Sequence, residues 1–326
     1  MNLTITPIKV DELSALMLED AVKEGWLYST YDVDCYFNYP LNRIYAIHVD
    51  DELAGCVLLH ESLSRVQGSP LRSAGFFLVK EKYRGQRIVG PLLWQNAITA
   101  SISREMLVCF HAVPRAVNFY ERLGFLRTSL VNIFYSLQLK QINKAPLAAI
   151  IPLIEKGVLK RITSFHEIDG YTETLFNGAS GAGFCDFIHH WVARADAIIL
   201  AYYEQGVVRG YGVLTVCKQS DKEGETSLCY RVSPLYADSI EIADSLVKAL
   251  VYDAWQNKAE RIELNSLASA DSPFASKLAD LGFIARGKNY VIANHNHLID
   301  NKAAILDKVF ASLPLEYPHE VTGGFD

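Results

Sequence analysis

An internal duplication limits the folds open to this chain more than any other feature of its sequence. Three segments recur in the same order: Leu53–Leu58 as Val207–Leu214, Val79–Tyr83 as Val232–Tyr236, and Leu123–Phe125 as Leu281–Phe283. Tyr236 follows Tyr83 by 153 residues and Phe283 follows Phe125 by 158 residues. A period of this length indicates a duplicated domain and excludes a solenoid of short repeats.

The length of 326 residues agrees with two domains of about 150 residues each. The repeat predicts a first module over residues 1–140 and a second module over residues 161–294. Pro146 and Pro152 interrupt the pattern between them, which predicts a linker over residues 141–160. Residues 295–326 remain as a C-terminal helix and tail, with an amphipathic helix expected over residues 298–313.

Each half alternates strand-like and helix-like segments. Expected strands in the first half are residues 3–8, 44–49, 54–60, 74–79, 106–111 and 125–139. Expected helices are residues 11–24, 91–102 and 114–123, where apolar residues follow helical spacing. Strand pairs followed by strand–turn–helix units predict an α/β (α+β) fold. Each module is then a mixed, mostly antiparallel sheet flanked by helices.

The composition is that of a soluble globular protein and excludes several classes. The formal net charge of −6 argues against a nucleic-acid partner, since no basic face dominates. No apolar run approaches the roughly 18 residues of a membrane helix, so we expect no membrane partner. Six cysteines without a C-x-x-C pair predict free thiols and a cytoplasmic location.

Two histidine pairs were considered as metal ligands. His189 and His190 diverge by about 100° if they lie on a helix. His295 and His297 share a face only if they lie on a strand. Because no cysteine or carboxylate cluster accompanies either pair, we expect no metal.

A basic turn over residues 83–90 is the first candidate for chemistry. It lies between an expected strand and a helix that begins at Pro91, so backbone N–H groups gather at a positive helix end. Lys80, Lys82, Arg84 and Arg87 add positive charge around the turn. This pattern predicts a phosphate or pyrophosphate site; the alternative is a solvated basic turn that only begins a helix.

These motifs resemble those of the GNAT superfamily of N-acetyltransferases. The turn Arg84–Gly90 is similar to the acyl-CoA-binding loop of that family, and Tyr120–Phe125 matches its Tyr-x-x-Leu-Gly-Phe ending. Glu24–Trp26 with Asp32, and Gly210–Val213 in the second half, resemble a tandem-GNAT subgroup, as does the segment Ser233–Asp238. The resemblance implies acetyl-CoA as co-substrate and an amine, on a small molecule or a peptide, as acceptor.

The resemblance also implies a cofactor site in the first module. Phe77, Leu78 and Val79 would contact the pantetheine arm through their backbone. The pyrophosphate would be held by the turn residues Arg84, Gly85, Gln86, Arg87, Ile88, Val89 and Gly90. Arg87 and Val89 replace family glycines, and we expect Val89 to weaken binding because a β-branched residue resists positive φ.

Tyr120 is the one predicted catalytic residue, in the family role of the acid that protonates the departing thiolate. The alternative is a tyrosine that only packs in the core. Glu24, Trp26 and Asp32 are predicted to line an amine pocket; the alternative is a capped helix end with a packed tryptophan. No general base is evident, although His60 and His111 stand at strand ends.

The second module lacks the corresponding groups. It has Tyr236-Ala237-Asp238-Ser239 in place of the basic turn, and Leu278 stands opposite Tyr120. A carboxylate at a helix start repels pyrophosphate, so we expect that this module does not bind CoA.

Together these patterns predict a cytoplasmic N-acetyltransferase whose chemistry lies in the first module. The rival hypothesis is a non-catalytic acyl-CoA-binding sensor or interaction scaffold on the same fold. Either protein would be a monomer or a homodimer.

Overall fold

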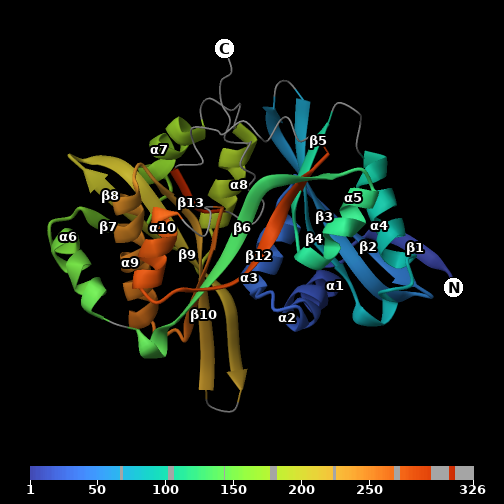
Figure 1. Cartoon of the computed structure of the whole chain (residues 1–326), viewed down its shortest axis with the longest axis horizontal. Helices are drawn as coiled ribbons and strands as arrows, with labels where there is room; N and C mark the ends of the chain where they lie inside the picture. Colours follow the sequence, from blue (N-terminus) through green and yellow to red (C-terminus); the bar gives the residue numbers. More distant parts are fainter. Residues whose placement is uncertain are drawn as a thin grey trace.

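A single mixed sheet runs through both modules (Figure 1). The computed structural model describes the chain except residues 67–68, 102–105, 143, 177–181, 223–224, 268–271, 295–307 and 313–326. The strand order is β1-β2-β3-β4-β5-β12-β6-β11-β10-β9-β8-β7, and β13 pairs with β10 beside this path. The pairs β4–β5 and β10–β11 are parallel, and the other strand pairs of the described chain are antiparallel. The predicted fold class is confirmed.

The first module contributes six strands and five α-helices. The strands are β1 Leu3–Pro7, β2 Asn42–Val49, β3 Glu52–Val66, β4 Ser69–Val79, β5 Leu107–Ala112 and β6 Leu126–Gln138. The helices are α1 Val10–Ala15, α2 Ala21–Lys23, α3 Thr30–Asn38, α4 Val89–Ala97 and α5 Val117–Arg122. A capping box at Ser29 and Asp32 starts α3.

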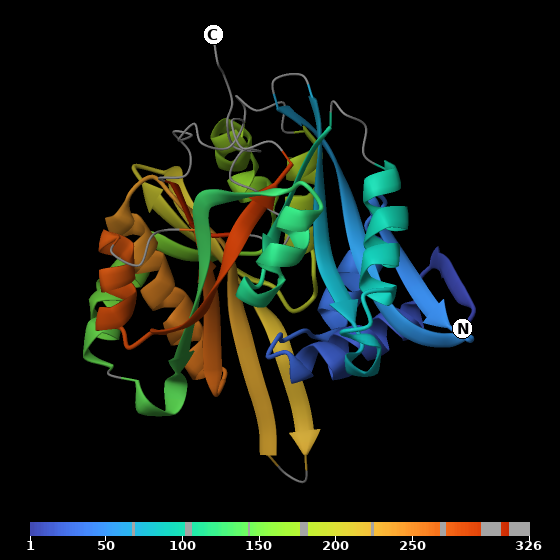
Figure 2. The same ribbon diagram turned by 45° about the vertical axis from the view of Figure 1, so that its right-hand side comes forward.

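The second module and its flanks repeat this plan. The strands are β7 Leu159–Ile162, β8 Ile198–Glu204, β9 Val207–Lys222, β10 Glu225–Ala237, β11 Arg261–Ser266, β12 Ile284–Ala293 and β13 Val309–Ala311. The helices are α6 Ile151–Glu155, α7 His166–Phe176, α8 Ala182–Val192, α9 Ile240–Gln256 and α10 Pro273–Asp280. The β9–β10 hairpin extends away from the rest of the molecule (Figure 2).

The two modules exchange strands at the centre of the sheet. β6 of the first module pairs with β11, whereas β12 of the second module pairs with β5. β6 and β12 also pair with each other, so each module completes the sheet of the other (Figure 1).

Three apolar clusters hold the helices on the sheet. One packs α4 and α5 on the first module and another packs α9 and α10 on the second. The third contains residues of α1 and α3 together with Phe187 and Trp191 of α8, and is therefore shared by both modules. None of the described helices is long and apolar enough to cross a membrane.

The C-terminal segment differs from the sequence expectation where it is described. Val309–Ala311 forms β13, so the helix expected over residues 298–313 does not include these residues. Phe310 and Ala311 are buried in the cluster that packs α9 and α10, whereas Val309 is buried in the cluster shared by both modules. β-branched and aromatic residues favour a strand. Residues 295–307 lie outside the described part of the chain.

Candidate functional site

The parallel strands β4 and β5 separate partway along their length. They pair only where Leu71–Ser73 faces Leu107–Cys109. Phe76 has a positive φ of 42°, and the register of β4 against β3 shifts next to it, which is a β-bulge that turns the strand. From Gly75 to Val79 the edge of β4 that faces β5 is therefore not paired with a described strand.

This opening leads into a cavity of about 1000 Å³ that residues of both modules line. Its walls include Phe77, Leu78 and Val79 of β4, which the sequence predicted beside the pantetheine arm. Tyr120 of α5 also lies in the wall. The second module supplies residues of β10, β11 and β12, because the exchanged strands meet at the cavity floor.

The basic turn lies at one end of the cavity. Arg84, Gly85, Arg87 and Gly90 line it, whereas Gln86, Ile88 and Val89 are not among its lining residues. Gly85 and Arg87 have positive φ values of 77° and 57°. A turn of this kind aims successive N–H groups at one side, as an anion site requires.

The reason expected for an effect of Val89 is not met, because Val89 does not have a positive φ. Val89 is the first residue of α4, and its side chain is fully buried in the first-module core. The position that needs a left-handed backbone is occupied by Arg87, where a non-glycine residue is strained by about 1 kcal/mol.

Glu24 lies between two arginines of the cavity. Its carboxylate accepts a hydrogen bond of 2.5 Å from Arg84 and another from Arg115. Partial burial alone would raise the pKa of the Glu24 carboxyl, but the hydrogen bonds from Arg115 and Arg84 outweigh burial and lower it. Arg84 also donates to the Val79 carbonyl over 2.6 Å. Glu24 therefore ties the basic turn to the start of α5 and is ionised at neutral pH.

Tyr120 is enclosed by aromatic rings. The ring centroids of Phe110 and Trp94 lie 4.5 and 4.8 Å from its own. Burial raises the pKa of Tyr120 well above its ordinary value, so the phenol keeps its proton at physiological pH. A protonated phenol in the wall of the cavity has the form that a proton donor requires.

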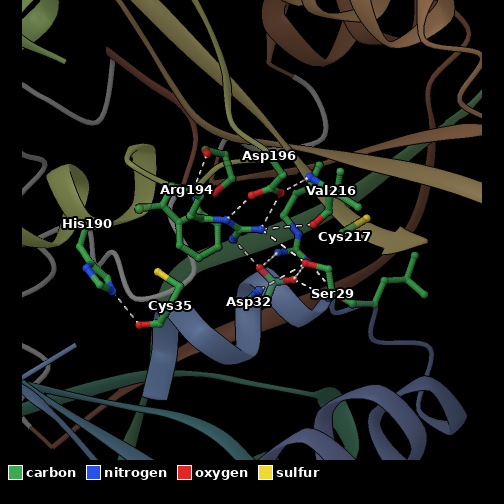
Figure 3. Close-up of polar contacts among 12 residues, drawn as sticks. Ser29, Asp32, Cys35, His190, Arg194, Asp196, Val216 and Cys217 are labelled. Atoms are coloured by element: carbon green, nitrogen blue, oxygen red, sulfur yellow. Dashed lines mark hydrogen bonds and ion pairs between the residues drawn. The ribbon is translucent and has the colours of Figure 1, made fainter. Parts of the chain in front are cut away.

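The two other predicted acceptor residues have different positions. Trp26 lines the cavity and contacts Phe76 edge-on, with ring centroids 6.3 Å apart. Asp32 is fully buried outside the cavity lining, which corrects its expected place in an amine pocket. It caps α3, and its carboxylate oxygen forms an ion pair with the guanidinium of Arg194 in the second module, at 2.7 Å. Figure 3 shows Arg194 between Asp32 and Asp196.

The histidines predicted as candidates lie in different surroundings. His60 is buried away from the cavity and bonded to Asn42 over 2.9 Å. His111 of β5 lines the cavity. His189 contacts Asp169 and His190 contacts the Cys35 carbonyl, so the adjacent pair diverges. His295 and His297 lie outside the described residues. Within the described part, no group of three metal-ligating side chains is present.

The equivalent opening of the second module is occupied by the chain itself. β13 pairs with β10 at Leu235 and Tyr236, and the Ser312 amide donates to the Asn265 carbonyl of β11 over 3.1 Å. Asp238 is held by Lys308 at 2.8 Å. A protein strand thus bridges β10 and β11 where the first module has its cavity.

Several cavity residues carry no motif that could have predicted them, among them six polar or charged residues. They come from the exchanged strands and β11: Asn132, Ser136, Glu263, Asn265, Arg286 and Lys288. The signal available was the alternation in Arg261–Ser266, where polar residues alternate with Ile262 and Leu264, but alternation alone does not reveal a cavity.

A parallel strand pair recurs in both modules, and in the first module it opens beside a basic turn. Residues 11–125 match the model of the acetyltransferase (GNAT) family, and residues 175–283 match that of an acetyltransferase (GNAT) domain. The chain therefore belongs to the GNAT superfamily and carries two GNAT domains in tandem.

Solved structures share this fold at low sequence identity. A tandem GNAT protein from the clavulanic acid biosynthesis pathway is 15% identical with a TM-score of 0.65, over 90% of this chain and 98% of that one. A candidate acetyltransferase from Pyrococcus horikoshii is 13% identical with a TM-score of 0.65, over 97% and 96%. Saccharomyces cerevisiae N-myristoyltransferase with bound myristoyl-CoA is 9% identical with a TM-score of 0.64, over 97% and 86%. No curated protein sequence matches the chain.

Proposed function

We propose that this protein transfers an acetyl group from acetyl-CoA to an amine, in the cytoplasm, with the chemistry in the first module. The observation that carries the proposal is the opening between β4 and β5, because it brings the edge of β4, the basic turn and Tyr120 to one cavity. An acyl-CoA thioester supplies the activated acetyl group when it is bound there.

The residues present fit such a ligand. The edge of β4 from Gly75 to Val79 offers backbone groups to the pantetheine amides, as in strand addition. The turn offers Gly85 and Arg87 to the phosphates, and Arg87 has no ion pair with any described acidic group. The positive charge of the turn supports acetyl-CoA over an uncharged thioester.

In the transfer step, the amine nitrogen forms a bond to the thioester carbonyl carbon and the carbon–sulfur bond breaks. Backbone N–H groups of β4 next to the bulge polarise the carbonyl oxygen. Tyr120 donates its proton to the departing sulfur, a contribution typically worth 10²–10⁴-fold in rate. The proton that the amine loses passes to water in the cavity.

A turnover assay separates this function from that of an acyl-CoA-binding sensor. The full chain is incubated with acetyl-CoA and a panel of primary amines, and free CoA thiol is measured against time. Amine-dependent thiol release supports the transferase. Tight acetyl-CoA binding without release for any amine would assign the sensor role instead.

A further inference from the structure

The cavity floor opposite the β4 edge is formed by the exchanged strands. On β6, Asn132 and Ser136 face the cavity, whereas Ile133 and Leu137 lie in the second-module core. This is the alternation of a strand with one polar and one apolar face. The floor of the cavity therefore carries polar side chains at positions where apolar side chains would also suit a strand.

Two of these polar atoms are buried without a hydrogen-bond partner in the described chain. They are Asn132 Oδ1 and Ser136 Oγ, in residues that are 2% and 5% exposed. The Asn132 amide nitrogen lies 3.3 Å from His111 Nδ1, which holds the amide with its oxygen turned elsewhere. Buried acceptors of this kind are costly unless a donor meets them, so they suit a ligand with N–H groups.

Glu263 adds a negative charge next to these acceptors. The β11–β6 register places Glu263 directly opposite Ser136, so the two side chains are cross-strand neighbours on the cavity face. The Glu263 carboxylate lies 3.3 Å from Arg261 Nε, and its side chain is 27% exposed. A carboxylate beside two neutral acceptors is a favourable setting for an ammonium group.

The first residues of β12 carry the opposite charge. Arg286 and Lys288 line the cavity, and neither has an ion pair with an acidic side chain among the described residues. Glu24, an acid of the same cavity, is bound by Arg84 and Arg115. This end of the cavity therefore has positive charge that a ligand can neutralise.

We propose that the acceptor is a small primary amine that also carries a carboxylate, an inference that rests on the proposed function. Its amino group lies at Asn132, Ser136 and Glu263 before transfer. Its carboxylate is bound by Arg286 and Lys288. The exchanged strand β12 and strand β11 thereby give the second module a part in acceptor specificity.

Matched acceptors test the carboxylate directly. Initial rates are measured with a panel of L-amino acids and the corresponding L-amino-acid amides, for the full chain and for Arg286→Gln and Lys288→Gln. The ratio of kcat/KM for acid over amide is compared between proteins, which cancels differences in amine basicity. We expect this ratio to fall about tenfold in each variant.

Further variants locate the effect. Lys140→Gln removes an equal charge outside the cavity and leaves the ratio unchanged. Glu263→Gln raises KM for acids and amides alike, because both carry the amine. The calorimetric Kd for acetyl-CoA stays unchanged in Arg286→Gln and Lys288→Gln.

Three results would overturn the proposal. Equal kcat/KM for amino acids and their amides with the full chain would show that the acceptor needs no carboxylate, while the transferase function would stand. A weaker Kd for acetyl-CoA in Arg286→Gln or Lys288→Gln would assign those cations to CoA. Micromolar binding of acetyl-CoA without transfer to either class would defeat the acceptor proposal, and the transferase function would fall with it only if no amine of the wider panel reacted.

Discussion

Glu24 and Asp32 are two acidic residues that the structure does not place as a general base. Both carboxylates are held by arginines, at 2.5 Å from Arg84 and 2.7 Å from Arg194. Neither is placed to take a proton from an amine. The sequence could mark these residues as unusual, but it could not show that their partners lie up to 162 positions away.

Tyr120→Phe tests the predicted proton donor. The substitution removes one hydroxyl and keeps the ring that packs on Phe110 and Trp94. We expect kcat to fall about 10²-fold or more while the Kd for acetyl-CoA stays within twofold. Steady-state kinetics and calorimetry measure the two quantities, and Tyr45→Phe, outside the cavity, serves as control. Equal kcat in the two proteins would leave Tyr120 as a packing residue.

Two histidines, the buried His60 and the half-buried His111, predict how stability depends on pH. Burial lowers the pKa of His60 and of His111 from 6.5 to about 4. Below pH 6.5 each of these histidines binds a proton in the unfolded chain, whereas in the folded chain it stays neutral until about pH 4. Their contribution to stability is therefore complete above pH 6.5 and is lost as the pH falls from 6.5 toward 4, by about 3 kcal/mol per histidine at most.

Denaturant unfolding at a series of pH values checks this dependence. In His60→Gln the free energy of unfolding should decrease less steeply between pH 6.5 and 4 than in the unchanged protein. His166→Gln, at a side chain that is 90% exposed, should leave the slope as it was. Parallel profiles for all three proteins would show that His60 titrates normally in the folded state.

At the scale of elements, β13 distinguishes the two modules. Phe310 is 5% exposed and packs on Phe274 with ring centroids 4.9 Å apart. Phe310→Ala should lower the free energy of unfolding by about 3–5 kcal/mol through the cavity it leaves. The exposed Phe37→Ala should cost about 0.5 kcal/mol. Chemical denaturation measures the free energy of unfolding of both variants. Similar losses in Phe310→Ala and Phe37→Ala would mean that β13 does not pack tightly in the opening of the second module.

The sequence predicted most elements of the first module but not the strand exchange. The Leu-Gly-Phe segments before β6 and β12 correctly mark where each module begins its last strand. Nothing local says which sheet that strand joins, because the pairing of β12 with β5 joins Tyr290 to Ala112 across 178 positions. Residues on these strands, such as Asn132 and Glu263, were missed for the same reason.

At the scale of the whole molecule, the exchange of strands β6 and β12 and the buried ion pairs of Arg194 make the two modules interdependent. Arg194 bridges Asp32 of the first module and Asp196 of the second, with a side chain that is 4% exposed (Figure 3). Arg231 donates to the Leu27 carbonyl across the same boundary. We therefore expect the duplicated chain to unfold as one unit.

Arg194→Met should destabilise both modules together. Removing Arg194 leaves the Asp196 carboxylate buried without its cation and Asp32 with Arg231 alone, at 3.5 Å, at a cost of about 3–5 kcal/mol. Tryptophan fluorescence and circular dichroism should report one coincident transition at lower denaturant. Lys140→Gln, at an exposed ion pair, should change little. Two separated transitions would contradict the interdependence of the modules.

Calorimetric titration of acetyl-CoA into the full chain tests the central claim most directly. The claim is that the first module binds the thioester in the β4–β5 opening while β13 closes the equivalent opening of the second. It predicts a micromolar Kd, about −8.2 kcal/mol, with one ligand bound per chain. Binding of two ligands, or no heat at millimolar acetyl-CoA, would contradict it.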